Sequence, residues 1–138
     1  MLKGKLIHPE ILEALGKAGH GSKILIADGN YPFATAAAPR AKQVYLNLSP
    51  GLLKATDVLR ALVEAIPVEA AAVMMPPGEV PQIFAEFSEI LPDEMALDPL
   101  ERFAFYAAAR DDNVALVIAT GEERVYANIL LTIGVVKQ

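Results

Sequence analysis

The chain has 138 residues, of which 54% are apolar and 21% charged, with a formal net charge of −5 and no cysteine. This composition is typical of one compact domain, which we expect to cover residues 1–138, and its acidity argues against nucleic acid or an anionic membrane surface as a partner. Without cysteine there are no disulfides, thiol catalysis or thiolate metal sites, and two histidines are too few for a multi-histidine metal centre.

Hydropathy bears on location and assembly. No stretch approaches the length of uninterrupted apolar sequence that a membrane span needs, and Lys3 and Lys5 are not followed by the apolar core of a signal peptide. We therefore expect a cytoplasmic protein. The mean hydropathy of +0.35 is high for a soluble chain of this size and indicates apolar surface buried between subunits.

Helical patterns and short apolar runs alternate along the chain. The first helix is expected to begin at His8 and Pro9, because proline suits a first turn, and to end at a Gly19 cap. The further expected helices are 57–66, capped by Thr56, 80–91 and 98–110, and the expected strands are 24–27, 44–48, 69–75, 114–119 and 126–133. Helices alternating with buried strands predict an α/β fold, a single-domain layered sheet with helices on its faces.

Strand 24–27 has a titratable residue before it and another after it. His20 stands between Gly19 and Gly21, and Asp28 follows directly on the apolar run. A histidine titrates near neutral pH and can both take and give a proton, so the two ends of this strand are candidate site walls. The alternative is that the glycines only end a helix and begin a turn.

Arg102 is a second candidate because it presents five fixed donors to hydroxyl or carboxylate groups. The alternative is an ion pair with Asp98, four residues earlier on the expected helix 98–110. The flanking Phe103 and Phe105 are expected to lie in the core or in a subunit contact.

Tyr126 and Asn128 form the third candidate. On a strand, residues two apart point to one face, so a hydroxyl and an amide would stand side by side and suit a polyhydroxylated ligand. The alternative is a solvated edge strand. His8 is interpreted as a helix-start residue, and Met74 and Met75 as core.

Several short motifs, in this order along the chain, resemble the L-fucose mutarotase and D-ribose pyranase family of sugar-anomer isomerases. The matching segments are Leu2-Lys3, residues 9–12, Gly19-His20-Gly21, Asp28, Val73-Met74-Met75, residues 102–106, Thr120-Gly121-Glu122 and residues 126–131. The Arg-Phe-Ala-Phe-Tyr segment at 102–106 favours the fucose branch. One departure is Asn30, where that branch often carries a second histidine.

The resemblance implies a mutarotase with a family-like layered fold. His20 would be the catalytic proton donor and acceptor, and Asp28, Arg102, Tyr126 and Asn128 would bind the monosaccharide. No metal, redox group or other cofactor is implied. The family forms ring-like homo-oligomers, of which a decameric ring is one, with sites where adjacent subunits meet. A ribose-type pyranase acting on another monosaccharide and a non-catalytic sugar-binding oligomer remain as alternatives.

Overall fold

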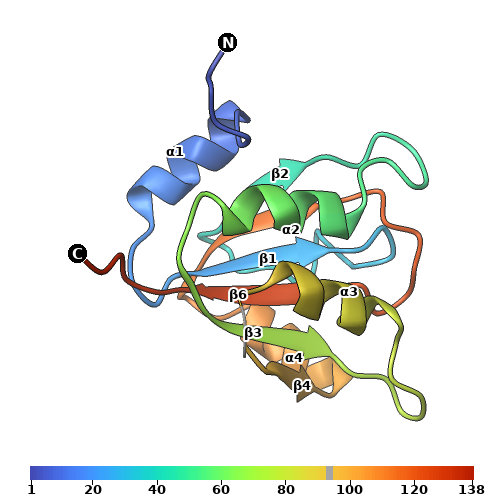
Figure 1. The fold of residues 1–138 in the computed structure, drawn as a ribbon. Coiled ribbons are helices and arrows are strands. Elements are labelled where there is room, and N and C mark those ends of the chain that lie inside the picture. The colour runs from blue at the N-terminus through green and yellow to red at the C-terminus, as the bar shows by residue number, and fades with distance from the viewer. Residues whose placement is uncertain (93–94) are drawn as a thin grey trace.

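The computed structural model describes residues 1–92 and 95–138, and within them six strands form one mixed sheet in the order β2-β5-β1-β6-β3-β4 (Figure 1). The strands are β1 (Lys23–Ala27), β2 (Lys42–Tyr45), β3 (Val68–Met74), β4 (Leu97–Leu100), β5 (Val114–Ala119) and β6 (Ile129–Ile133). The helices are α1 (Pro9–Lys17), α2 (Ala55–Val63), α3 (Ile83–Ile90) and α4 (Arg102–Ala109). None of these helices is long and apolar enough to cross a membrane.

The sheet consists of two parallel groups joined by one antiparallel strand. Strands β2, β5 and β1 pair in parallel, as do β3 and β4, while β6 lies between β1 and β3 and is antiparallel to both. The carboxyl ends of β1 and β3 therefore lie at one edge of the sheet, together with the start of β6. The start of β1 lies at the opposite edge, together with the end of β6.

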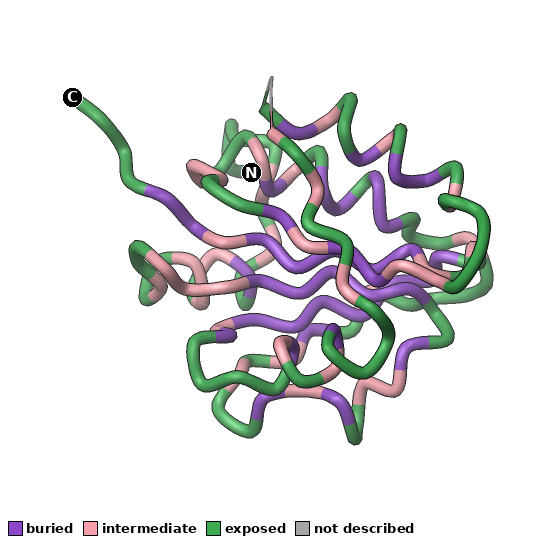
Figure 2. Tube along the Cα trace, turned by 90° about the horizontal axis from the view of Figure 1, so that it is seen from below, coloured by how far each residue is buried: buried purple, intermediate pink, exposed green. Residues whose placement is uncertain are grey.

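Both faces of the sheet are covered, which explains why its central strands are continuously apolar. Alternation along β1 sends Ile24 and Ile26 to a core under α1, α2 and α3, and Leu25 and Ala27 to a second core under α4. Figure 1 shows α2 and α3 in front of the sheet and α4 behind it. Figure 2 shows the buried strands as a purple centre inside mostly exposed connections. The predicted layered α/β fold is thus confirmed.

Helix starts follow local capping chemistry. His8 is the N-cap of α1, and its Nδ1 accepts a hydrogen bond from the Ile11 amide at 3.4 Å, as a helix-start residue should. Thr56 was expected to cap the next helix, and this prediction was wrong. Helix α2 begins at Ala55, Thr56 is buried in its first turn, and the Asp57 carboxylate accepts from the backbone amide of Lys54.

The end of α1 also differs from the expectation of a Gly19 cap. The helix ends at Lys17 with Ala18 as its C-cap. Of the two glycines beside His20, only Gly21 has a positive φ, of 85°. The turn that follows α1 spans residues 19–22, closed by the Ser22 amide donating to the Gly19 carbonyl at 3.0 Å, so His20 lies inside it and Gly21 supplies the positive φ.

Two element predictions near the candidate residues were wrong. The expected helix 98–110 is instead strand β4 followed by α4, which begins at Arg102 with the Glu101 side chain accepting from the Ala104 amide at 2.8 Å. The expected strand 126–133 begins only at Ile129, because the preceding residues form a loop in which Tyr126 has a φ of 60°. Tyr126 and Asn128 thus do not share a strand face.

Candidate functional site

A small cavity of about 160 Å³ opens at the edge of the sheet where β1 and β3 end. Four of the five predicted site residues line it, namely Asp28, Arg102, Tyr126 and Asn128. The other lining residues are Asn30, Tyr31, Met74, Tyr106 and Val125. Polar groups converging on a partly apolar hollow are typical of a small-ligand site.

Asp28 organises the floor of this cavity because it follows directly on β1 and is only 2% exposed. Its backbone amide donates to Asn128 Oδ1 at 2.7 Å, and its Oδ2 accepts from Asn128 Nδ2 at 3.1 Å and from the Ala127 amide at 3.2 Å. Its Oδ1 accepts from the Asn30 amide at 2.9 Å. Burial raises the pKa of the carboxyl group, and these donors partly offset that rise.

Tyr126 reaches the cavity from a strained loop. Its φ of 60° lies in the left-handed region, which a tyrosine seldom occupies and which persists only where the surroundings hold it. On its C-terminal side, Ala127 and Asn128 are bonded to Asp28. The loop therefore owes part of its shape to the same carboxylate that faces the cavity.

Arg102 and Tyr106 form the outer wall. Arg102 Nε donates to Tyr106 Oη at 3.3 Å, and this bond raises the pKa of the guanidinium. Arg102 Cζ lies 5.6 Å from the centre of the Tyr106 ring and 5.4 Å from that of Phe103. The predicted ion pair with Asp98 required a shared helix, so that alternative is wrong. Phe105 is fully buried, as expected, but Phe103 is 68% exposed.

A charged clamp that sequence reasoning missed holds the other end of the Tyr126 loop. The Glu122 carboxylate is buried, and it accepts from Arg124 Nε at 2.9 Å, from Arg124 Nη2 at 3.0 Å and from the Ala55 amide at 3.2 Å. Arg124 Nη1 also pairs with Glu86 on α3. Burial acts to raise the pKa of Glu122, but Arg124 and the backbone amides outweigh it and leave the pKa lowered.

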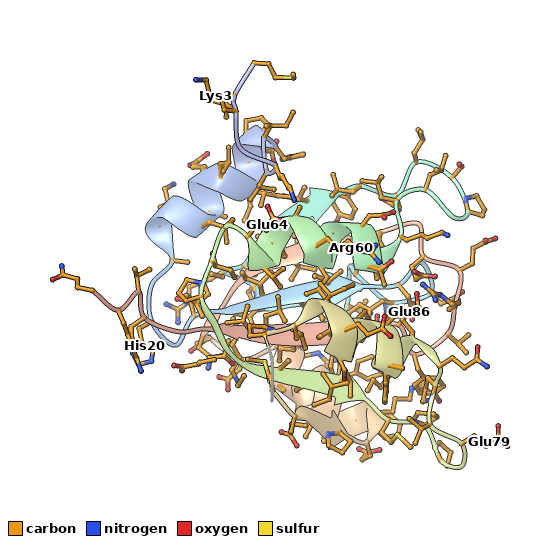
Figure 3. The ribbon with its side chains drawn as sticks, viewed as in Figure 1. Lys3, His20, Arg60, Glu64, Glu79 and Glu86 are labelled. Atoms are coloured by element: carbon orange, nitrogen blue, oxygen red, sulfur yellow. The ribbon has the colours of Figure 1, made fainter. Side chains whose placement is uncertain are left out.

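His20 lies at the opposite edge of the sheet. Figure 3 shows it where β1 begins, with Glu86 of the clamp toward the other end. Strand β1 alone spans about 16 Å at the usual rise per residue. The structure therefore confirms that His20 and Asp28 occupy the two ends of one buried strand, but a single chain does not bring them together. The His20 side chain is 59% exposed and its Nε2 lies 3.0 Å from Glu69 Oε2.

Two larger hollows border the cavity. One of about 440 Å³ shares Asn30 with it and continues along the segment 120–123. The other, of about 630 Å³, shares Arg102 and Tyr126 and includes the exposed Phe103. Met74 is buried beside the first cavity, in agreement with its interpretation as core. In the described part of the chain, no three histidine, aspartate or glutamate side chains converge as a metal site requires.

Comparison with known proteins identifies the family that this chain resembles in sequence and fold. The model of the RbsD / FucU transport protein family matches residues 1–136. The chain is 30% identical to the fucose mutarotase of Danio rerio, over 99% of this chain and 95% of the relative, and 30% identical to the D-ribose pyranase of Variovorax paradoxus (strain S110), over 98% of each.

A solved structure has the same fold. The fucose mutarotase of Streptococcus pneumoniae in complex with L-fucose superposes with a TM-score of 0.81 at 28% identity, covering 99% of this chain and 100% of that one. Sequence and fold agree over nearly the whole length of the chain. It therefore belongs to the RbsD/FucU family.

Proposed function

We propose that this protein is a sugar mutarotase that interconverts the α and β anomers of a monosaccharide of the L-fucose type. The observation that carries the proposal is the cavity in which Asp28, Arg102, Tyr126 and Asn128 converge. Relatives named fucose mutarotase and D-ribose pyranase, and a relative's complex with L-fucose, support a monosaccharide as the ligand.

The reaction needs proton transfer and little else. The anomeric hydroxyl gives a proton to a base, the bond between the anomeric carbon and the ring oxygen breaks with its electron pair going to the oxygen, and the ring oxygen takes up a proton. Rotation of the open aldehyde and the reverse steps give the other anomer. A positioned acid and base contribute about 10²- to 10⁴-fold to such a step. His20 is the residue we assign to this role, because an imidazole can both take and give a proton.

The residues around the cavity would hold the sugar. The Asp28 carboxylate can accept from a sugar hydroxyl, and the Arg102 guanidinium can donate to one or two of them. Tyr106 and Tyr126 add hydroxyls beside aromatic surface, which suits a pyranose ring that is polar at its rim and apolar on its faces.

Because His20 and the cavity lie at opposite edges of the sheet within one chain, we propose that a neighbouring copy supplies His20 to each cavity. The high apolar content and the exposed Phe103 beside the cavity support an assembly with subunit contacts there. The predicted homo-oligomer, with a decameric ring as one form, is part of this proposal.

Saturation-transfer NMR on a panel of monosaccharides, fucose and ribose among them, tests the activity because it detects exchange between anomers at equilibrium. We expect exchange with at least one sugar, lost in His20→Ala and retained in His8→Ala. A His20→Ala variant with normal exchange in an intact oligomer would show that the acid/base assignment is wrong. Binding without exchange would favour the sugar-binding alternative, and exchange of ribose alone would favour the pyranase.

Mixing two inactive variants tests whether sites form between copies. His20→Ala and Asp28→Asn subunits, unfolded together and reassembled at equal amounts, should regain roughly a quarter of the wild-type sites if each site takes one residue from each of two copies. Each variant reassembled alone is the control. If the mixture stays as inactive as the controls, each site draws both residues from one chain.

A further inference from the structure

Glu69 lies 49 positions after His20 in sequence and faces it in space. His20 Nε2 is 3.1 Å from Glu69 Oε1 and 3.0 Å from Oε2, so both carboxylate oxygens share the same ring nitrogen. Figure 3 shows the His20 side chain at the edge of the sheet where β1 begins and β6 ends. The contact could be an ordinary exposed ion pair, and such pairs contribute little. Three features of the backbone argue that it is more than that.

The first feature is a β-bulge at Glu69. The register between β3 and β6 shifts between Val68 and Ala70, so Glu69 is the extra residue of the pair. Glu69 and Ala70 are both exposed, and the buried part of β3 begins only at Ala71. Bulges turn a side chain away from its regular direction and are enriched next to active sites. This bulge directs Glu69 toward His20.

The second feature is a glycine that lies beside Glu69. Gly134 directly follows β6, the strand that separates β1 from β3. A Cβ atom at Gly134 would stand 3.1 Å from Glu69 Cβ and 3.4 Å from Glu69 Oε2. A side chain at this position would press on the base of the Glu69 side chain, so the glycine leaves room for Glu69 to adopt the direction in which it meets the imidazole.

The third feature is the anchoring of the His20 turn. The Gly21 amide donates to the Ile133 carbonyl at 2.9 Å, and the Ile133 amide donates to the Ser22 carbonyl at 2.9 Å. Ser22 Oγ also accepts from the Gly19 amide at 3.3 Å. The turn is thus tied to the end of β6, beside Glu69, and its position does not depend on the His20 side chain itself.

We propose that Glu69 is a positioning residue for His20, which fixes the imidazole with a proton on Nε2 and leaves the Nδ1 lone pair as the base. The proposal rests on the proposed function, because it assigns Glu69 a part in the same proton transfer. The carboxylate accepts from Nε2–H, orients the ring and stabilises the imidazolium that forms when Nδ1 takes the anomeric proton. Among the described residues, Nδ1 has no hydrogen-bond partner, so it is free to face a sugar.

The direct test is the ring tautomer of His20 in the wild-type protein, read from ¹⁵N NMR shifts of labelled histidine, with His20→Ala used to assign the signals. We expect the neutral ring to carry its proton on Nε2 almost completely, and in Glu69→Ala to relax to the ordinary mixture of tautomers of a free histidine, in which Nε2–H is only the major form. A wild-type ring protonated on Nδ1 would overturn the proposal, whether or not the protein shows exchange with any sugar.

Kinetics provide the second test. In Glu69→Gln, which keeps the size but removes the charge, we expect kcat for anomer exchange to fall on the order of 10- to 100-fold with KM unchanged, the range found when a partner that orients a metal-bound histidine is lost. Glu64→Gln is the matched control, because Glu64 is also exposed and paired, with Lys5. Gly134→Ala should lower kcat as well, by crowding Glu69.

The outcomes separate the two proposals. If His20→Ala abolishes exchange while Glu69→Gln exchanges at the wild-type rate, His20 is catalytic but Glu69 does not position it. If His20→Ala retains exchange, the acid/base assignment itself fails. If KM rises in Glu69→Gln while kcat is unchanged, Glu69 contacts the sugar instead of the histidine. Sedimentation of each variant establishes that assembly is intact.

Discussion

Replacing Arg124 by methionine should destabilise the protein by leaving the buried Glu122 carboxylate without its guanidinium partner. Methionine keeps the backbone amide and much of the apolar side-chain length, so Glu122 retains only the amides of residue 124 and Ala55 as donors. Removing one partner of a fully buried pair costs about 3–5 kcal/mol. Because the Arg124 side chain is 39% exposed, water can replace part of it beside the Glu122 carboxylate in the variant. We therefore expect a smaller loss, of about 1–3 kcal/mol in the free energy of unfolding.

The pH dependence of this loss has a definite sign. In the wild type, the lowered pKa of Glu122 contributes stability that is present above the pKa of the unfolded chain and is lost as the pH falls through the folded value. Without Arg124, burial is no longer outweighed and the pKa of Glu122 rises. The loss should therefore be largest near pH 7 and shrink toward about pH 4, where the carboxyl group protonates.

Urea unfolding at a fixed protein concentration measures both effects. The matched control is Arg40→Met, because Arg40 pairs with Asp112 at the surface and its loss should change the free energy by less than about 0.5 kcal/mol. The double variant Glu122→Gln with Arg124→Met removes the unpaired charge and should recover part of the loss. If Arg124→Met unfolds at the same urea concentration as Arg40→Met at neutral pH, the clamp contributes no stability.

Three further outcomes are expected. Arg102→Lys should weaken sugar binding, measured by titration with NMR detection, and leave the thermal midpoint of unfolding nearly unchanged. The reason is that lysine keeps the charge but loses the planar fork of the guanidinium. A much lower midpoint with intact affinity would show that Arg102 is structural. Sedimentation at micromolar concentration should give a mass several times 14.8 kDa, and a monomer would contradict the shared site. Chelating agents should leave anomer exchange unchanged, whereas loss on chelation and recovery with a divalent ion would indicate a metal enzyme.

The sheet could be predicted from the sequence because its central strands are buried on both faces. Residues 24–27 and 114–119 are short continuous apolar runs between turn signals, which is typical of strands covered on both faces. Strand β4 was missed because its sequence, Leu-Asp-Pro-Leu, has no apolar period and contains Pro99, which is tolerated there since β4 is at the edge of the sheet. Asp-Pro also begins many helices, so the pattern favoured the wrong element.

The site could be predicted only in part. Asp28 and Asn128 were identified, but their mutual hydrogen bonds join residues 100 positions apart, and no local pattern encodes such a pair. The strained φ of Tyr126 is imposed by contacts on both sides of its loop, so tyrosine itself gives no signal of it. Glu122 follows Thr-Gly and resembles a solvated loop residue, although it is buried. The nearest hint of close packing there was Gly121, where an added Cβ atom would lie 2.1 Å from the Leu52 carbonyl oxygen.

The position of β6 affects the order in which the chain can fold. It is the last strand in sequence, yet it lies between β1 and β3 and is the bridge between the two parallel groups. Until residues 129–133 have left the ribosome, β1 and β3 each present an unpaired apolar edge, and such edges attract other chains. The two halves of the sheet can therefore join only after synthesis of this last strand. The same event brings Gly134 beside Glu69 and supplies the backbone to which the His20 turn is tied. The end of the sheet that carries His20 is thus completed only after this strand has been made.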